Sequence, residues 1–393
     1  MNLTLIRRKK TKNMSTKVNT AKLPFGLSSS KWERVETPFV VTDLGKVKEN
    51  VSNFKKLLPQ VKVHYAVKAN AEPRIIQQLD SLVSGYDIAS LGELDLLLKQ
   101  GVEPSRMLYS NPVKLPSHIK GAYKKGVRYF VFDSVTEVEK LAKYAPGSDV
   151  HLRLKVSDYG SKFPLSKKFG IDQTHALDYC SFAQDAGLKV KGLTFHVGSQ
   201  SENLQVWENA LEIAGKTIDR LHKKGIRIEY LNLGGGFPAD YGEPTPSLKE
   251  VSSTINKSLA KFIPSNISLL AEPGRYIVAD ASVLVTSVIG REHRSGTDWL
   301  YLDVGAFQGL IEPLEIKGWR YPIYTDKNPA GYKKDFVLSG PTCDPYDTIG
   351  QDYHLPSDIN VGDRLYIGSV GAYTFVYASH FNGFDPPKMY YME

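Results

Sequence analysis

Cysteine is scarce in this chain, with only Cys180 and Cys343 among 393 residues. Two thiols cannot build a disulfide framework, so we expect a protein of a reducing compartment such as the cytoplasm. Apolar runs of about 18 residues, the length that crosses a bilayer, are also missing, and no membrane span is expected. The first 22 residues contain no acidic side chain but seven lysines and arginines.

The formal net charge of +8 comes almost wholly from that N-terminal segment. Removing its seven basic residues from the total of 50 leaves 43, against 42 acidic residues. The remaining chain is close to neutral, which excludes a strongly basic nucleic-acid-binding face. Residues 1–22 are interpreted as a basic, disordered tail, a targeting segment, or sequence ahead of an internal start at Met14. They have no long apolar core and do not form a secretory signal.

From about residue 43 onward, strand and helix patterns alternate along the chain. Asp43 is suited to cap a first helix, and eight apolar strand candidates follow it. The strands are expected at residues 62–68, 86–89, 107–111, 128–133, 150–156, 192–197, 230–234 and 268–271. Amphipathic helices are expected at residues 91–99, 136–144, 172–186, 206–224 and 248–262. Eight alternating units predict an α/β fold with a parallel (β/α)₈ TIM-like barrel over residues 37–275.

The pattern changes after Arg275. Short β-rich runs broken by glycine and proline appear at residues 281–289, 299–303, 334–339 and 364–367, without a long helix. Val40–Thr42 precedes the first barrel helix and is a further strand candidate. The sequence therefore predicts a second, mostly β domain that draws on both chain ends, from residues 23–36 and 276–393.

Ionisable side chains that could take part in catalysis recur near the C-terminal ends of the predicted barrel strands, where barrel enzymes have their active sites. In chain order they are Lys68, Asp87, Arg153, His196 and Glu272. A lysine at the mouth of a buried strand is a candidate Schiff-base amine, because desolvation lowers its pKa. Taken singly, each residue also has an ordinary interpretation, as a solvated lysine, a core histidine or a turn glutamate.

A phosphate site is indicated near the last two strands of the barrel. Gly234–Gly236 brings backbone N–H groups together without side chains, and Ser199 and Arg275 add a hydroxyl and charged donors. A plain tight turn is the alternative for the glycines. Neither a Walker loop nor Rossmann spacing is present, and no metal-ligand set is expected. An amine, a carboxylate, a flat imidazole and an anion site on one face together match pyridoxal 5'-phosphate.

These motifs resemble those of the fold-type III pyridoxal-phosphate decarboxylases, the group of ornithine, lysine, diaminopimelate and biosynthetic arginine decarboxylases, and ornithine decarboxylase most of all. The similarity extends from about Pro38 to Phe384. It is carried by Ala66–Asn70, Asp87–Ser90, His196–Ser199, Gly234–Phe237, Glu272–Arg275, Cys343–Asp347, Gly371–Thr374 and Phe381–Phe384. The resemblance implies an alanine racemase-like barrel, bound pyridoxal phosphate, and a homodimer with shared active sites.

The resemblance also implies a role for each residue. Lys68 would form an imine with the cofactor's aldehyde, Glu272 would pair with the ring nitrogen with support from Arg153, and His196 would stack on the ring. The phosphate would lie against Ser199, Gly235, Gly236, Gly274, Arg275 and Tyr373, with Asp87 nearby. Cys343 and Asp344 would enter from the second subunit, Cys343 to protonate the carbanion and Asp344 to meet the substrate's distal amine. Phe381 and Tyr373 would line the substrate pocket.

The motif Cys343-Asp344-Pro345-Tyr346-Asp347 resembles the Cys-Asp-x-x-Asp pattern of ornithine and lysine decarboxylases, whereas diaminopimelate enzymes resemble a Cys-Glu-Ser pattern there. An acid at Asp344 suits a cationic substrate tail. Glu312 or Glu315 is expected as a second acid for that amine. A carboxylate at Glu272 keeps the ring nitrogen protonated and favours decarboxylation over racemisation.

The expected activity is therefore decarboxylation of L-ornithine to putrescine. Lysine, a modified diamino acid and diaminopimelate are the alternative substrates. A different class of function is that of an inactive regulatory homologue. The presence of Lys68, His196, Glu272, Arg275 and Cys343 argues against that class.

Overall fold

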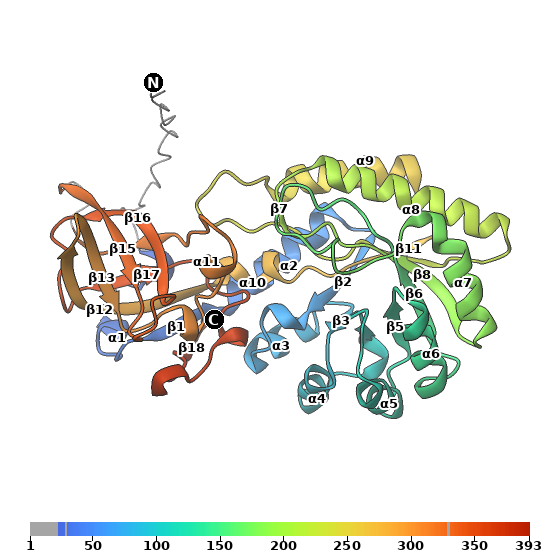
Figure 1. Cartoon of the computed structure of the whole chain (residues 1–393), viewed down its shortest axis with the longest axis horizontal. Coiled ribbons are helices and arrows are strands. Elements are labelled where there is room, and N and C mark those ends of the chain that lie inside the picture. Colours follow the sequence, from blue (N-terminus) through green and yellow to red (C-terminus); the bar gives the residue numbers. More distant parts are fainter. Residues whose placement is uncertain (1–22, 28–29, 328–330) are drawn as a thin grey trace, which may run out of the picture.

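The computed structural model describes residues 23–27, 30–327 and 331–393, and these form two lobes side by side (Figure 1). The basic tail expected at residues 1–22 lies outside the described residues. The larger lobe contains a closed barrel of eight parallel strands. In barrel order these are β10 (Tyr230–Asn232), β11 (Ser268–Ala271), β2 (Val61–Ala66), β3 (Gly85–Ile88), β4 (Met107–Tyr109), β5 (Tyr129–Phe132), β6 (Asp149–Arg153) and β8 (Lys189–Thr194). The predicted barrel is confirmed.

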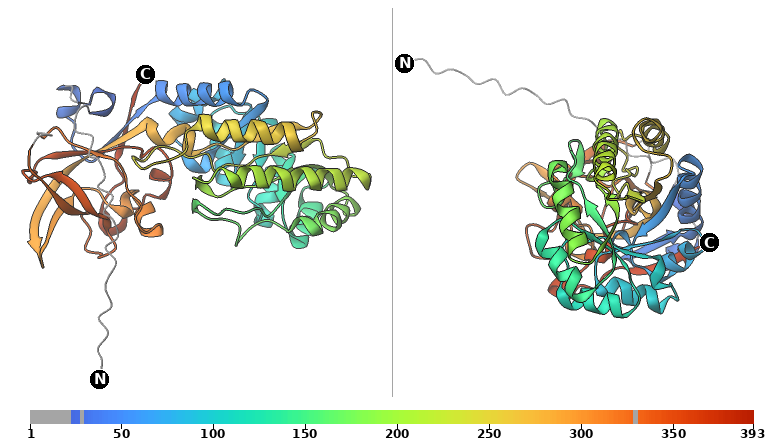
Figure 2. Two further views of the ribbon diagram at one scale, coloured as in Figure 1. Left: turned by 90° about the horizontal axis from the view of Figure 1, so that it is seen from above. Right: turned by 90° about the vertical axis from the view of Figure 1, so that its right-hand side faces the viewer.

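Helices surround the barrel strands, as the view in the right half of Figure 2 shows. They are α2 (Leu44–Leu57), α3 (Pro73–Asp80), α4 (Leu91–Lys99), α5 (Pro116–Lys124), α6 (Val135–Tyr144), α7 (Ala176–Asp185), α8 (Gln205–Lys223) and α9 (Leu248–Phe262). The expected cap of the first helix is present, because the Lys46 amide donates to Asp43 Oδ1 at 2.9 Å. Sequence reasoning missed α3 and α5, which both begin with proline, a residue suited to the first helical turn.

Several barrel strands end earlier than their apolar pattern predicts. The chain turns into a short 3₁₀ helix, η2 (Val67–Ala69), directly after β2, and η2 carries Lys68. In the same way β8 stops at Thr194, two residues before His196. Lys68 and His196 therefore lie on turns at the barrel rim, whereas Asp87 and Arg153 lie within β3 and β6, near the ends of these strands.

The smaller lobe is an eight-stranded sheet. Its main path is β14 (Ile323–Tyr324), β17 (Arg364–Ile367), β12 (Ser282–Arg294), β13 (Thr297–Leu302), β15 (Lys333–Ser339) and β16 (Thr348–Pro356). β1 (Phe39–Asp43) pairs antiparallel with β12 and parallel with β18 (Lys388–Met392), so both chain ends enter this sheet. The sequence predicts that the barrel domain begins at residue 37, which would include β1, but β1 pairs with strands of the second lobe. Residues 39–42 are buried, which suits a strand with partners on both edges.

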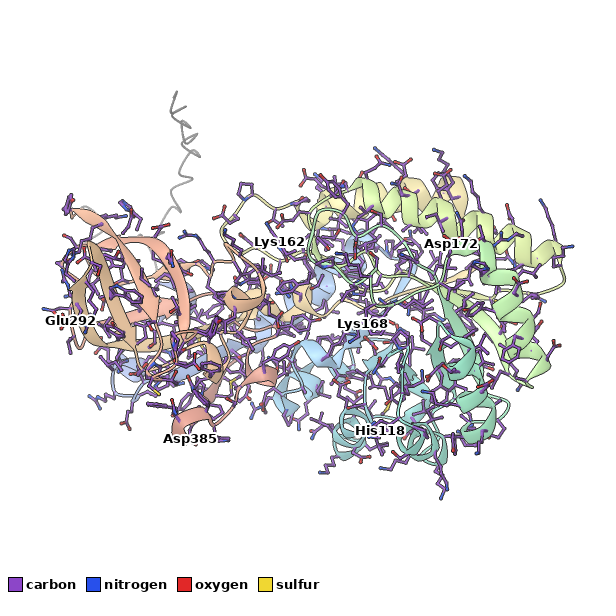
Figure 3. All side chains as sticks on the ribbon, in the orientation of Figure 1. His118, Lys162, Lys168, Asp172, Glu292 and Asp385 are labelled. Atoms are coloured by element: carbon purple, nitrogen blue, oxygen red, sulfur yellow. The ribbon has the colours of Figure 1, made fainter. Side chains whose placement is uncertain are left out.

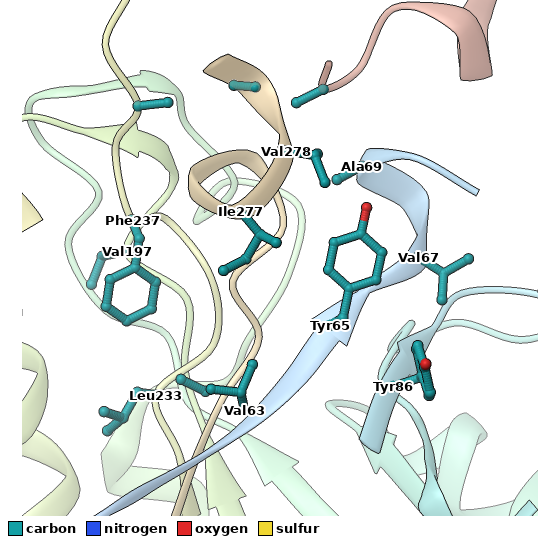
Figure 4. Close-up of a cluster of buried hydrophobic side chains, with 14 of the residues drawn as sticks. Val63, Tyr65, Val67, Ala69, Tyr86, Val197, Leu233, Phe237, Ile277 and Val278 are labelled. Carbon is teal, nitrogen blue, oxygen red and sulfur yellow. The ribbon is translucent and has the colours of Figure 1, made fainter. Parts of the chain in front are cut away.

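The two lobes are tied together at the turn that carries Lys68. Asn70 Nδ2 donates to the Gly371 carbonyl at 2.9 Å, and the Tyr373 amide donates to the Ala69 carbonyl at 2.9 Å. Beneath this turn, Tyr65 and Val67 pack in a buried apolar cluster with residues that include Ile277 and Val278 (Figure 4). The lysine turn is therefore fixed by packing from below and by hydrogen bonds from the second lobe.

Charged side chains cover both lobes (Figure 3), with Lys162 and Asp172 on the barrel lobe and Glu292 and Asp385 on the β lobe. Among the described residues, no helix is both long and apolar enough to cross a membrane.

Candidate active site

Lys68 forms an ion pair with the buried carboxylate of Asp87, which lies on the neighbouring strand β3. Ser110, at the end of β4, donates a hydrogen bond to the other oxygen of the same carboxylate. Three consecutive barrel strands thus contribute one side chain each, and these meet at the rim. The sequence predicts Asp87 near the phosphate, and the structure places it against Lys68.

The protonation of Lys68 differs from the sequence expectation. Burial acts to lower the pKa of its amine, but Asp87, Tyr373 and Glu272 oppose this, and the net effect raises the pKa above its ordinary value. The sequence interpretation, which considered desolvation alone, was wrong on this point. The stable form of Lys68 is therefore an ammonium paired with the buried carboxylate of Asp87. This ammonium must lose a proton before its nitrogen can attack a carbonyl group.

Glu272 is held by Asn232, whose Nδ2 donates to Glu272 Oε1 at 2.6 Å. The carboxyl is buried, and burial followed by the charge of Asp87 raises the pKa of Glu272 to about 7. Lys68, Asn232 and Arg153 act against this rise. Glu272 can therefore exchange a proton with a nitrogen base near neutral pH, and Arg153 is close enough to favour its charged form.

His196 lies between this acid and the glycine turn. Burial, followed by the positive charges of Arg153 and Lys68, lowers the pKa of His196 well below its usual range, so the ring is neutral. A side chain at Gly235 would bring its Cβ within 3.0 Å of His196 Nε2. Gly236 has a φ of +106°, a conformation that side chains rarely adopt. Only glycine lets this turn pass so close to the imidazole.

Arg275 is the centre of a buried polar cluster at the start of α10 (Arg275–Val278). Its guanidinium donates to Ser199 Oγ at 3.2 Å, to the Tyr241 hydroxyl at 2.6 Å and to Glu312 Oε1 at 2.6 Å. Four aromatic rings lie within 6 Å of it, those of Phe163, Tyr241, Trp319 and Tyr373. Ser199, Arg275 and Tyr373 are thus brought together, as predicted.

Gly274 stands next to this cluster and also tolerates no side chain, since a Cβ there would lie 2.8 Å from the Ala69 Cβ. The Ser201 amide donates to the Gly236 carbonyl at 3.0 Å, which fixes the glycine turn beside the segment of Ser199. The glycines, Ser199 and Arg275 therefore form one continuous cradle with backbone amides and a guanidinium.

Glu312, expected as a substrate acid, is buried on the short helix α11 (Glu312–Glu315). Its Oε1 accepts from Arg275, and its Oε2 accepts from the Tyr321 hydroxyl at 3.2 Å. Both carboxylate oxygens are occupied in this arrangement. Glu315, the other candidate, is exposed.

Cys343, Asp344 and Phe381 do not meet the Lys68 cluster through any hydrogen bond or ion pair among the described residues. Cys343 is exposed, and its thiol donates to Asn382 Oδ1 at 3.5 Å, beside Phe381. Asp344 accepts from the Tyr346 amide at 2.8 Å. These residues form a surface on the second lobe that we call the Cys343 surface.

The second aspartate of the cysteine motif has a structural function. Asp347 is fully buried and accepts from the Ala306 amide and from the amide and hydroxyl of Thr342. It fixes the loop that presents Cys343 and Asp344.

Sequence reasoning missed the residues that orient the predicted ones. Ser110, Asn232, Tyr241 and Tyr321 each hydrogen-bond a candidate side chain. Asn232 offered a usable signal, because it is a polar residue at the end of an apolar strand, two positions before the triple glycine. Tyr241 and Tyr321 offered none, since tyrosines are common in this chain and no local pattern sets these two apart.

This arrangement fits pyridoxal phosphate on the observations above. The cradle of Gly235, Gly236 and Arg275 has room only where a Cβ is missing, and its charge suits a phosphate. Glu272 is an acid that titrates near neutrality, His196 is a neutral flat ring, and Lys68 is a primary amine beside both. Together they supply the contacts that this cofactor requires.

Comparison with known proteins gives the same class. The family model for the pyridoxal-binding domain of pyridoxal-dependent decarboxylases matches residues 44–279. The lysine/ornithine decarboxylase of Selenomonas ruminantium is 39% identical, over 90% of this chain and 88% of its own length. The ornithine decarboxylase of Schizosaccharomyces pombe is 32% identical, over 90% of this chain and 83% of its own. The chain belongs to the family of pyridoxal-dependent decarboxylases.

A solved structure agrees closely with this fold. The crystal structure of SrLDC in complex with PLP and cadaverine has a TM-score of 0.85 and 37% identity, and the match covers 93% of this chain and 94% of that one. The chain is thus a pyridoxal-phosphate-dependent carboxy-lyase that acts on a basic amino acid. The predicted family, fold class, cofactor and enzyme class are confirmed.

Proposed function

We propose that this chain converts L-ornithine to putrescine and CO₂, as a cytoplasmic homodimer with shared active sites. The observation that carries the proposal is the convergence of Lys68, Asp87, Glu272 and Arg275 on one barrel rim, in a chain whose second lobe presents a half-buried acid, Asp344, and an exposed thiol. Two unpaired cysteines suit a reducing compartment.

The cofactor, when bound, supplies an electron sink for the pair released as CO₂ leaves. Lys68 would hold it covalently until the substrate's α-amine takes the place of the lysine, and Asp87 would balance part of the positive charge on the Lys68 nitrogen. Glu272 would keep a proton at the ring nitrogen, and Arg153 and Asn232 favour the ionised form of Glu272 against the effect of burial. Neutral His196 gives the ring a flat surface without adding charge.

Asp344 is assigned to the distal amine of the substrate and Cys343 to proton delivery at the α-carbon, both from the partner subunit. Two observations support a partner-facing role. Cys343 is exposed, and Tyr346, Phe381 and Phe384 expose large apolar side chains on the same loops. Apolar exposure of this kind marks surfaces that become covered.

Glu312 is proposed as the second acid for the substrate amine. Its carboxylate must then release Arg275 or Tyr321, since each of its oxygens already accepts a hydrogen bond. Arg275 has two further contacts, with Ser199 and Tyr241, and so stays in place when Glu312 turns away.

L-Lysine is the second candidate substrate, because it carries the same terminal charge on a chain one methylene longer. Such a difference changes binding by only about 1–3 kcal/mol. Diaminopimelate carries a carboxylate at its far end, which Asp344 and Glu312 would repel.

A panel of amino acids tests the proposal. The purified protein with pyridoxal phosphate is incubated separately with L-ornithine, L-lysine, L-arginine and meso-diaminopimelate, and diamine and CO₂ are quantified. We expect the highest kcat/KM with ornithine and none with diaminopimelate. A higher kcat/KM with lysine would mean that lysine, and not ornithine, is the substrate. If no cationic amino acid yields CO₂, the assignment as a basic-amino-acid decarboxylase is refuted.

A further inference from the structure

A second cavity, of about 270 Å³, lies at the end of the barrel opposite to Lys68. Its lining includes Lys62, His64, Arg106, Tyr129, His151 and Tyr230. Lys62, Arg106, Tyr129 and Tyr230 stand at or near the starts of β2, β4, β5 and β10. His64 and His151 lie near the middle of β2 and β6, whereas the active-site residues lie near or beyond the strand ends. The cavity is therefore separate from the catalytic rim, with the barrel interior between them.

Two histidines line this cavity, His151 buried and His64 half-buried, and each has at least one ring nitrogen without a hydrogen-bond partner among the described residues. His151 is 2% exposed, and neither its Nδ1 nor its Nε2 has a partner among the described residues. His64 Nδ1 is likewise unpaired within the described chain. Buried polar atoms in native proteins are nearly always satisfied by protein, water or ligand. Three unpaired nitrogens on one cavity therefore indicate that something polar occupies it.

The neighbouring glycines show that the rings are accommodated closely. A Cβ at Gly85 would lie 2.6 Å from His64 Cδ2, and a Cβ at Gly192 would lie 3.0 Å from His151 Cγ. Larger residues on β3 and β8 would displace both imidazoles. The two strands thus have glycine, which has no side chain, at the positions that face the two histidine rings.

The electrostatics of the cavity favour an uncharged occupant. Burial lowers the pKa of both His64 and His151 to about 4, so both rings are neutral at physiological pH. Arg106 is already engaged by the Asp80 carboxylate at 2.6 Å and by the carbonyls of Asp80 and Val83. Lys62 is exposed at the rim. A buried anion would therefore lack an inner counter-charge.

A metal ion is also disfavoured. Nowhere among the described residues do three His, Cys, Asp or Glu side chains gather in a metal-binding arrangement. Two imidazoles would supply only two of the four ligands of a tetrahedral metal ion and leave the other two positions to water. Neutral imidazoles instead offer one donor and one acceptor each, which suits a partner that has both.

The aromatic side chains add a flat wall. Tyr230 is stacked on His151, with ring centroids 5.9 Å apart and an interplanar angle of 16°, and Tyr129 meets the same imidazole edge-on at 6.5 Å. We propose that this cavity, lined by His64, His151, Tyr129 and Tyr230, binds a neutral, planar nitrogen heteroaromatic molecule of one or two rings. Its ring nitrogens would hydrogen-bond the unpaired imidazole atoms.

Benzimidazole is a suitable probe, because at pH 8 it is neutral, flat, and both donates and accepts a hydrogen bond. Crystals of the holoenzyme are soaked with it, and its affinity for the dissolved holoenzyme is measured by calorimetry. We expect density in the cavity within hydrogen-bond distance of His151. Indole has the same shape but no acceptor nitrogen, and it should bind about tenfold more weakly for the loss of one hydrogen bond.

His151→Phe keeps a flat ring but removes both nitrogens, and it should weaken benzimidazole binding by about tenfold or more. His293→Phe, on an exposed hairpin of the second lobe, is the matched control and should leave the affinity unchanged. Soaked wild-type crystals with only ordered water on His151 would overturn the proposal, as would equal affinities of wild type and His151→Phe. Should His151→Phe fail to fold, the wild-type crystals alone decide.

Discussion

The two lobes prepare their share of the active site in different ways. On the barrel, Asp87, Glu272 and Arg275 are buried and already paired, Arg275 with Glu312 of the second lobe. On the second lobe, Cys343 is exposed, and within the described residues its thiol hydrogen-bonds only the side-chain amide of Asn382. The barrel residues thus have their partners in place, whereas the groups on the second lobe are proposed to act at the site of a second subunit.

The largest effect is expected from the barrel. Lys68→Ala removes the amine that exchanges the cofactor, and kcat should fall by about 10³-fold or more. Lys62→Ala, an exposed residue near the start of the strand that leads to Lys68, should retain activity within about twofold, as surface substitutions usually do. Turnover of ornithine by both variants, with cofactor supplied in excess, measures the difference. Appreciable activity of Lys68→Ala would contradict its assignment.

The second lobe is tested by mixing subunits. Lys68→Ala and Asp344→Ala homodimers should each be nearly inactive, because each removes one half of every shared site. After subunit exchange, half of the dimers carry both variants and have one intact site of two, so activity should recover to about a quarter of wild type. If mass spectrometry shows that the subunits have exchanged but activity does not recover, Lys68 and Asp344 of one active site come from the same chain.

The same contrast explains how much the sequence could reveal. The barrel strands and the rim residues followed from local patterns, since each lies at the end of an apolar run. The ends of β2 and β8 were placed too late, because apolar rim turns such as Val67–Ala69 continue the strand pattern. The pKa of Lys68 could not be predicted, because it depends on Asp87, a residue 19 positions away.

The second lobe was less predictable for a physical reason. Its sheet pairs β1 with β18, strands from opposite chain ends, and no local periodicity reports such a partner. The pairing of Arg275 with Glu312 joins the two lobes and was equally invisible, so both residues received separate functions. Long-range ion pairs need the fold before they can be assigned.

Glu312 lies where the two lobes meet, and Glu312→Gln sharpens the comparison. As a substrate acid it contributes a charge-assisted hydrogen bond, and its loss should raise the KM for ornithine about tenfold or more. The affinity for pyridoxal phosphate, measured by absorbance titration of the cofactor-free protein, should change much less. The reverse pattern would mean that Glu312 serves only to hold Arg275.

The smallest effect concerns the stability of the cofactor-free barrel. Because the pKa of Glu272 is raised to about 7 in the folded state, this state binds more protons than the unfolded chain between about pH 4.5 and 7. Its contribution to the free energy of unfolding is full below that window and falls as pH rises through it, by an order of 1–3 kcal/mol.

Glu272→Gln cannot titrate and should lack this decline. Urea unfolding of both proteins at pH 5 and pH 8 gives the comparison, and the difference between them cancels all other titrating groups. The same pH dependence in wild type and variant would mean that Glu272 is not the titrating group.

Reduction of the holoenzyme with borohydride tests the central claim most directly. The reagent fixes the cofactor to the nitrogen that holds it, and peptide mapping by mass spectrometry locates that nitrogen. We expect a single pyridoxyl-phosphate adduct on the peptide that contains Lys68. An adduct on another lysine, or none from protein with bound cofactor, would contradict the account.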